Sequence, residues 1–297
     1  MQNFLWLLLL ASMWAPSFLF IKIGLQGFPP LTLAAVRLTV AAVLMLAVLR
    51  MRGVSLPRDG ASWFRFTVMG LTANAFPFAM FSIGETHADS GLAAILNGTT
   101  PIFTTIIAHF VLKGERLQMR VVSGILFGFV GVLLIFIPRL RGAALGDSAV
   151  LGLVMFALAA ASYGVSTVWA KRHLQGYPSF VTPAAQFVTS SAMLLPIAFL
   201  FEDPFAIAPA WDAIGAVLIL AVFGTVIAYL VFYRLLAHVT ATWISYVTYI
   251  LPPVGLLLGI IFLDEQPGGF AWAGCGLILA GVMVMNGLVR LPRAAAR

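Results

Sequence analysis

The stretch LQGFP at Leu25–Pro29 returns almost unchanged as LQGYP at Leu174–Pro178, 149 residues further along the chain. A lysine stands three residues before each copy, Lys22 in the first and Lys171 in the second. Similarity at one fixed offset is the signature of an internal repeat. The chain is therefore expected to consist of two related halves.

The similarity extends over the full length of both halves. Further pairs of identical or similar residues lie 149 to 151 positions apart: Trp14 with Tyr163, Ser17 with Ser166, Pro101 with Pro252, Glu115 with Glu265, Gly124 with Gly274 and Gly131 with Gly281. We place the boundary between residues 143 and 144. This gives two domains, 1–143 and 144–297, of one repeat each.

The composition is that of a membrane protein. Of the 297 residues, 62% are hydrophobic and 9% are charged, whereas a soluble domain carries about a quarter charged residues. A helix needs about 20 apolar residues to cross the hydrocarbon core. Ten such runs occur, at 3–23, 30–49, 63–83, 89–112, 119–137, 149–171, 179–201, 211–233, 239–262 and 268–289. Helices satisfy their own backbone hydrogen bonds in lipid, and the alternating strands of a barrel are absent. The sequence predicts an all-α fold of ten transmembrane helices, five in each repeat.

The distribution of Lys and Arg predicts the orientation, because cytoplasmic loops are enriched in both. With a cytoplasmic N-terminus, the outer loops hold only Arg139 and Arg141. Thirteen basic residues then lie in the inner loops and ends: Arg50, Arg52, Arg58, Arg65, Lys113, Arg116, Arg120, Lys171, Arg172, Arg234, Arg290, Arg293 and Arg297. We therefore expect both termini in the cytoplasm. Five spans per repeat is an odd number, so the second repeat is expected to be inverted relative to the first.

Inverted repeats indicate a transporter that exposes a central site to each side of the membrane in turn. Other functions find less support. The net charge of +7 comes mostly from short spacers, with no basic cluster that would bind nucleic acid. Cys275 is the single cysteine, so we expect neither an intrachain disulfide nor a cysteine metal site. Enzyme motifs such as HExxH and GxSxG are missing. We expect no enzyme activity, no metal and no cofactor, and rings of charge that would mark a channel are also lacking.

Two pairs of stretches carry a family resemblance. TTPIFTTIIAHFVLKGERL (Thr99–Leu117) precedes the glycine-rich GILFGFVGVLLI (Gly124–Ile135), and the second half repeats this pattern as LPPVGLLLGIIFLDEQP (Leu251–Pro267) and GCGLILAGVMV (Gly274–Val284). In this doubled pattern the chain resembles the EamA family of the drug/metabolite transporter superfamily. The resemblance implies ten helices, a central cavity and transport of metabolites such as amino acids. Within the family, the chain looks most like the aromatic amino-acid exporters of the YddG type. We expect a multi-pass protein of the inner or plasma membrane, as a monomer or a homodimer.

Polar and aromatic residues inside the spans point to a binding site, because polar groups in lipid are costly and face a cavity or the bundle interior. Aromatic faces and neutral hydrogen-bonding groups suit an amphipathic solute such as an amino acid. The same residue types also join helices, so a packing role is an equal alternative for any single residue. The candidate substrate-binding residues are Trp14, Ser17, Asn74, Phe78, Asn97, Thr100, Tyr163, Ser166, Tyr229, Tyr246 and Tyr249.

Pro101 and Pro252 occupy related places in the fourth and ninth spans, where a proline removes a helix hydrogen bond. We interpret them as hinges, with a passive kink as the alternative. Arg37 lies inside the second span. For Arg37 we favour a structural role, by snorkelling or by bonding to backbone carbonyls, over neutralising a substrate carboxylate. The reason is that the second span is expected to be peripheral.

The glycines of the fifth span, Gly124, Gly128 and Gly131, lie four and three residues apart and form one stripe of small residues. We expect this stripe to pack within the chain rather than between protomers.

The placement of acidic residues predicts the mode of transport. Every Asp and Glu is expected in a loop or at a helix end, whereas proton-coupled exporters commonly carry an ionisable group deep in the membrane. We therefore predict facilitated diffusion, that is, a uniport. The alternatives are a proton-coupled exporter of drugs or of other metabolites such as sugars and nucleosides, and more distantly an intramembrane enzyme.

Overall fold

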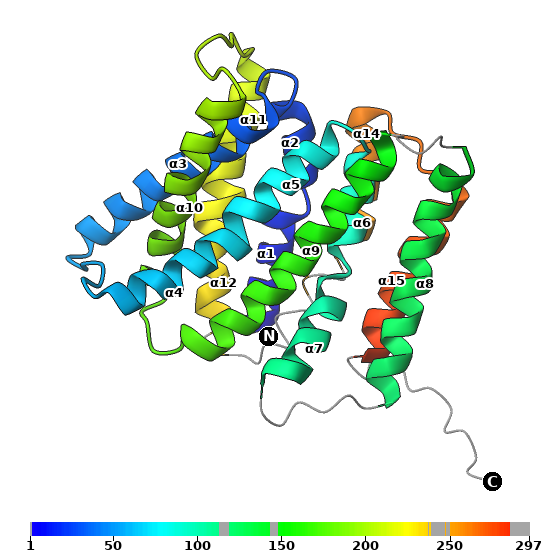
Figure 1. Cartoon of the computed structure of the whole chain (residues 1–297), viewed down its shortest axis with the longest axis horizontal. Coiled ribbons are helices and arrows are strands. Elements are labelled where there is room, and N and C mark those ends of the chain that lie inside the picture. Colours follow the sequence, from blue (N-terminus) through cyan, green and yellow to red (C-terminus); the bar gives the residue numbers. More distant parts are fainter. Residues whose placement is uncertain are drawn as a thin grey trace.

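The computed structural model describes residues 2–112, 119–142, 148–236, 238, 247 and 250–285 (Figure 1). The first half contains α1 (Gln2–Trp14), α2 (Ser17–Gly24), α3 (Pro30–Met51), α4 (Gly60–Gly70), the π-helical η1 (Leu71–Ala75), α5 (Phe76–Glu85), α6 (Ser90–Asn97), α7 (Thr100–Val111) and α8 (Met119–Gly142). The second half contains α9 (Ser148–His173), α10 (Val181–Phe201), α11 (Trp211–Ala221), the π-helical η2 (Val222–Ile227), α12 (Ala228–Leu236), α14 (Leu251–Leu263) and α15 (Gly269–Met285).

The predicted all-α membrane fold is confirmed. Eight stretches are long and apolar enough to cross a membrane, and they coincide with the first eight predicted spans. The shorter apolar helices α14 and α15 lie in the ninth and tenth. Most of 239–249 and the end of the tenth span lie outside the described residues.

Several spans combine two or three helical segments. The first is α1 followed by α2, with a break at Ala15–Pro16, and the fourth is α6 followed by α7, with a break at Gly98–Thr99. The third and eighth spans each contain a π-helical segment between two α-helices. Proline lacks an N–H donor, which explains the break at Pro16. Irregular backbone at membrane depth is tolerated where it is buried in protein or lines a cavity.

The first and third spans run in the same direction. Phe18 of α2 contacts Phe81 of α5, with ring centroids 5.3 Å apart. Four residues further along both helices, Lys22 Nζ donates a hydrogen bond of 2.6 Å to the main-chain carbonyl of Glu85. Contacts that advance together along two helices require parallel helices.

The sixth span runs against the third. Ser162 Oγ of α9 donates to the Thr72 carbonyl at 2.7 Å, and Trp169 Nε1, two turns later, donates to the Arg65 carbonyl at 3.1 Å, two turns earlier. The first span of the first repeat and the first span of the second repeat therefore cross the membrane in opposite directions. This confirms the predicted inversion of the second repeat.

The two halves pack against each other through related spans. Three pairs of equivalent helices contact each other: α3 with α10, α6 with α14 and α8 with α15. Two further contacts are related to each other by the repeat, namely α1 with α12 and α9 with α5. In Figure 1 the pair α8 and α15 stands side by side at one edge of the bundle. The boundary predicted between residues 143 and 144 falls in a stretch outside the described residues and stays a prediction.

The glycine stripe of α8 packs inside the chain, as predicted. A Cβ added at Gly131 would lie 2.7 Å from the Gly274 carbonyl oxygen of α15, and one at Gly281 would lie 2.8 Å from the Gly128 main-chain nitrogen. Only hydrogen at the Cα position allows such close backbone approach, which is the usual device for packing membrane helices.

Candidate functional site

Two π-helical segments occupy related places in the third and eighth spans. Segment η1 covers Leu71–Ala75 and η2 covers Val222–Ile227. The wider π turn alters the direction of the side chains that follow it, and such turns are frequent at functional sites. Neither segment was predicted from the sequence, although two candidate residues, Asn74 in η1 and Tyr229 two residues after η2, were.

Asn74 of η1 and Tyr229 of α12 connect these two spans. Asn74 Nδ2 donates to the Tyr229 hydroxyl at 3.0 Å, and that hydroxyl donates to the Ala73 carbonyl at 3.1 Å. Both side chains are buried, Asn74 completely. Asn74 Oδ1 has no hydrogen-bond partner among the described residues. The contact therefore leaves one buried acceptor available to a ligand.

Trp14 lies against the same tyrosine. Its ring meets that of Tyr229 edge to face, with centroids 6.0 Å apart, and that of Phe232 at 5.6 Å. Phe187 of α10 contacts Tyr229 from another direction at 5.1 Å. Trp14 is the last residue of α1, directly before the break in the first span. Three predicted residues, Trp14, Asn74 and Tyr229, are thus brought together by spans from both halves.

Arg37 adjoins this group and has partners inside the protein. Its Nε donates to Thr225 Oγ1 at 2.8 Å and its Nη2 to the Gly224 carbonyl at 3.4 Å, both in η2. The guanidinium carbon lies 3.9 Å from the centre of the Phe78 ring. Arg37 is 4% exposed, so it does not snorkel to the membrane surface, and its face of α3 is central rather than peripheral. These contacts agree with the structural role that we favoured.

The two predicted serines bond to main-chain carbonyls within their own spans. Ser17 Oγ donates to the Met13 carbonyl at 3.3 Å, and Ser166 Oγ donates to the Tyr163 carbonyl at 2.9 Å. Ser17 also lies near η2, since a Cβ added at Gly224 would be 3.1 Å from Ser17 Oγ. Each hydroxyl therefore offers a ligand its lone pairs and no free hydrogen.

Tyr163 of α9 joins the group through an aromatic contact. Its ring stacks on Phe81 with centroids 6.1 Å apart and an interplanar angle of 26°. Tyr163 also packs against the hydrophobic cluster that contains Phe78 and Tyr229.

Asn97 and Thr100 flank the break in the fourth span. Thr100 Oγ1 donates to the Asn97 carbonyl at 2.8 Å, and Asn97 is 9% exposed. Pro101 and Pro252 both stand in the first turn of a helix, α7 and α14 respectively. These two starts adjoin, because a Cβ added at Gly98 would lie 2.9 Å from Pro252 Cγ. Their role as hinges stays a prediction, and Tyr246 and Tyr249 lie outside the described residues.

A sequence model of the EamA-like transporter family matches the chain twice, over residues 2–137 and 150–287. The chain belongs to the EamA-like transporter family. It is a multi-pass membrane transporter. Similar proteins include an uncharacterized transporter of Archaeoglobus fulgidus, 28% identical over 95% of this chain and 96% of that protein. The uncharacterized inner membrane transporter YedA of Escherichia coli is 25% identical over 92% of this chain and 87% of its own length.

Another relative of this EamA-like transporter is a probable terminal-alkyne amino-acid exporter of Streptantibioticus cattleyicolor, 27% identical over 95% of this chain and 92% of that protein. One solved crystal structure shares the fold with a TM-score of 0.71 and 23% identity, and the match covers 97% of both chains.

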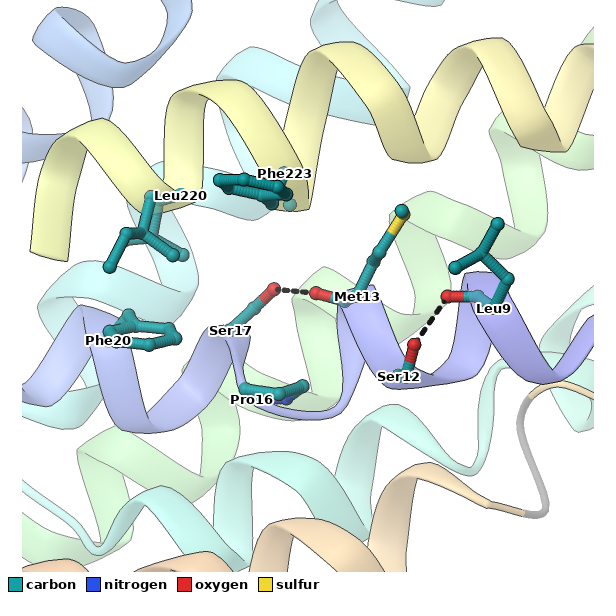
Figure 2. A pocket seen from close by; sticks show the side chains of 10 residues that line it. Leu9, Ser12, Met13, Pro16, Ser17, Phe20, Leu220 and Phe223 are labelled. Carbon is teal, nitrogen blue, oxygen red and sulfur yellow. Dashed lines mark hydrogen bonds between the residues drawn. The ribbon is translucent and has the colours of Figure 1, made fainter.

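A lateral pocket of about 370 Å³ opens between the first span and η2 of the EamA-like transporter (Figure 2). Ser17 and Gly224 line it, and so do Leu9 and Phe223, which are 39% and 50% exposed. In Figure 2 the Ser17 hydroxyl points to the Met13 carbonyl, which takes its hydrogen. The exposed rim is apolar and lies on two spans, so this pocket faces lipid.

A polar cluster lies where the first and third spans end and the fourth span begins. Glu265, in the loop before α15, accepts hydrogen bonds from Ser90 N and Ser90 Oγ, both at 2.7 Å, and from Gly91 N at 3.0 Å. Lys22 Nζ donates to the carbonyls of Glu85 at 2.6 Å and Ala88 at 3.0 Å. We name Lys22, Glu85, Ser90, Gly91 and Glu265 the outer clasp, because the distribution of Lys and Arg places them on the outer side of the EamA-like transporter.

Glu85 is the last residue of α5 and so lies at a helix end, as predicted, yet its side chain is completely buried. Helices α2 and α9, which are distant in sequence, pack against α5. The burial of Glu85 could therefore not be read from its position in its own span.

Proposed function

We propose that this transporter exports amino acids and amphipathic analogues, aromatic ones above all, across the cell (inner) membrane by alternating access. The observation that carries the proposal is the contact of Trp14, Asn74 and Tyr229. Here two inversely threaded repeats meet, beside a broken span and two π-helical segments. Transporters bind their substrates at such repeat interfaces, where helices are discontinuous.

The chemistry of this site suits an amphipathic amino acid. Trp14 and Tyr163 offer aromatic faces for an apolar side chain. The unpaired Asn74 Oδ1 is an acceptor for the substrate ammonium group, and the lone pairs of the Ser17 and Ser166 hydroxyls are further acceptors. We assign substrate contact also to Phe78, Asn97, Thr100, Tyr229, Tyr246 and Tyr249.

Two relatives support parts of this proposal. One is the probable terminal-alkyne amino-acid exporter, whose substrate class we extend to this chain in general form. YedA is an inner membrane transporter, and we place this chain in the same kind of membrane. An exporter of the YddG type is the finer assignment within the family.

The proposed mode is uniport, so that the gradient of the solute sets the direction of net flux. The competing proposal is a proton-coupled exporter of drugs, sugars or nucleosides. The two differ in whether a pH gradient drives accumulation.

Counterflow in proteoliposomes tests the substrate class. Purified protein is offered radiolabelled tryptophan, a sugar and a nucleoside separately. We expect saturable tryptophan counterflow that phenylalanine inhibits and that persists after the pH gradient is collapsed. Sugar transport alone would overturn the substrate class.

Tyr229→Phe tests the site within the same assay. It removes the hydroxyl that contacts Asn74 and is expected to raise the KM for tryptophan. Tyr233→Phe is the matched control, because the Tyr233 hydroxyl donates to Gln186 Oε1 at 2.9 Å and lies outside the proposed site. Equal KM values in the two variants would contradict the assignment.

A further inference from the structure

Glu85 is a buried acid without a hydrogen-bonding partner for its carboxyl group. The side chain is 0% exposed, and neither Oε1 nor Oε2 has a hydrogen bond to any described residue. Its main-chain carbonyl, in contrast, accepts a hydrogen bond from Lys22. The carboxyl group therefore lies inside the outer clasp without contributing to the hydrogen bonds that hold it.

The charged groups around Glu85 are engaged elsewhere. Lys22, Glu265 and Arg37 interact with it electrostatically. Lys22 bonds to main-chain carbonyls, Glu265 to Ser90 and Gly91, and Arg37 to Thr225 and Gly224. Two further titratable residues, His87 and Asp89, follow in the turn after α5. Helix α9 meets this end of α5 through the apolar Phe156 and through Gly152.

The closed arrangement fits a neutral carboxyl group better than a charged one. Burying an ionised carboxylate without donors costs far more free energy than burying the neutral acid. The outer clasp as the structure shows it therefore favours a proton on Glu85. Separation of the outer ends of the spans would admit water to the carboxyl group and favour loss of that proton.

We propose that Glu85 is a proton-binding site that controls closure of the outer side of the transporter. Proton uptake accompanies closure and proton release accompanies opening, both on the outer side. The proton does not cross the membrane, so the site is compatible with uniport. Higher external pH favours the ionised acid and hence the outward-open state. Because one proton is involved, the ratio of open to closed protein changes at most about tenfold per pH unit.

Distance measurements between two spin labels test this without any substrate. Labels are attached at Thr86→Cys and Gly268→Cys in a Cys275→Ser background in lipid nanodiscs. Both positions are exposed, Thr86 directly after Glu85 and Gly268 three residues after Glu265. From about pH 5 to about pH 9 the long-distance population is expected to grow. A distribution that stays constant over this range would overturn the proposal.

Two neutral variants keep the test decisive. Glu85→Gln and Glu85→Met are each expected to hold the short distance at every pH. Glu202→Gln is the matched control, because Glu202 is also an outer glutamate but accepts bonds from Leu31 N at 2.9 Å, Thr32 N at 2.6 Å and Thr32 Oγ1 at 2.7 Å. It is expected to respond to pH like the wild type. A full pH response in both Glu85 variants would refute the assignment.

The spin-label experiment is independent of the proposed substrate. Failure of tryptophan transport would leave the pH response intact, and a missing pH response would leave the substrate assignment intact. Accumulation driven by a pH gradient in the wild type, and lost in Glu85→Gln, would show that the proton crosses the membrane. It would overturn proton exchange restricted to the outer side.

Discussion

Arg37 holds three neighbours at once because its guanidinium group is flat and forked. The plane lies over Phe78, while two nitrogens reach Thr225 and the Gly224 carbonyl. An ammonium group is a point charge and cannot reproduce this combination. At this position the side chain joins the second, third and eighth spans.

Replacing Arg37 with lysine therefore tests a structural role against a role in substrate binding. We expect Arg37→Lys to lower the free energy of unfolding by about 1–3 kcal/mol, the usual effect of losing hydrogen bonds to a charged group. The melting temperature in detergent should fall, and the KM for tryptophan should not change. Arg50→Lys, at the exposed end of the same helix, is the control. A KM that rises for tryptophan but not for tryptamine, which lacks the carboxylate, would instead place Arg37 on the substrate.

Among the elements, the starts of α7 and α14 are where we predict hinge motion. Each begins beside a proline, Pro101 or Pro252, and the two starts adjoin through Gly98. A chain that lacks helix hydrogen bonds at one point bends there at low cost. The two segments can therefore change angle together.

Pro101→Ala is expected to supply an N–H group that can continue the helix across the break at Gly98–Thr99, and so to stiffen the fourth span. Transport rates in proteoliposomes should fall several-fold, while tryptophan binding by the purified protein stays close to wild type. Pro196→Ala, inside α10 and exposed, is the matched control and should leave the transport rate unchanged. Unchanged rates for Pro101→Ala would favour a passive kink.

Helices α8 and α15 approach each other through their backbones. A Cβ at Gly274 would lie 2.7 Å from the Gly131 carbonyl oxygen, whereas one at Gly276 meets nothing within 4 Å. Gly274→Ala is thus expected to push the helices apart, with a loss of about 1–3 kcal/mol as for other overpacked sites. Gly276→Ala should be tolerated. Thermal unfolding in detergent compares the two, and equal melting temperatures would argue against close packing as the reason for the stripe.

At the scale of the whole molecule, inversion of the repeats implies that the outer clasp has an inner counterpart. Lys22 corresponds to Lys171, and Glu265 corresponds to Glu115, which lies outside the described residues. Alternating access follows if each half adopts in turn the conformation of the other. Closure on one side then replaces closure on the opposite side.

Replacing Lys22 and replacing Lys171 should change the ratio of outward-open to outward-closed protein in opposite directions. Lys22→Met leaves two main-chain carbonyls without their charged donor, so the long distance between labels at Thr86→Cys and Gly268→Cys should gain about tenfold or more in population. Lys171→Met should reduce the same population. A shift in the same direction for both variants would contradict the symmetry argument.

The spans were predictable because each depends only on the length of one apolar run. Their inversion then followed from the odd number of spans in each repeat. The glycine stripe was predictable for the same reason, since its spacing lies within one helix. The π-helical segment η1 was not predictable, because LTANA at Leu71–Ala75 has no proline or glycine to mark it. Segment η2 contains Gly224, but glycines are frequent in these spans and do not mark a π turn.

The candidate site was predicted in part. Trp14, Asn74 and Tyr229 were selected from the sequence, and the structure shows the contacts of Tyr229 with Trp14 and with Asn74. Their role in substrate binding stays a prediction. The burial of Glu85 depends on which helices, distant in sequence, pack against it. The sequence of its own span does not contain this information. One signal was available in the sequence: Glu85 lies at the end of the third span, shortly before the polar residues His87 and Asp89.

The pairing of α3 with α10, α6 with α14 and α8 with α15 means that most helices find their principal neighbour in the opposite half. Each repeat is thus one subunit of a covalently fused pseudo-dimer, and the linker between them mainly fixes a stoichiometry of one to one. After the duplication the two repeats could acquire different sequences, but only if the residues that contact each other remained compatible. Arg37 and Gln186, which lie 149 residues apart, occupy equivalent positions in the two repeats but differ in charge. A substitution of this kind in one repeat requires matching changes in the residues of the other repeat that contact it.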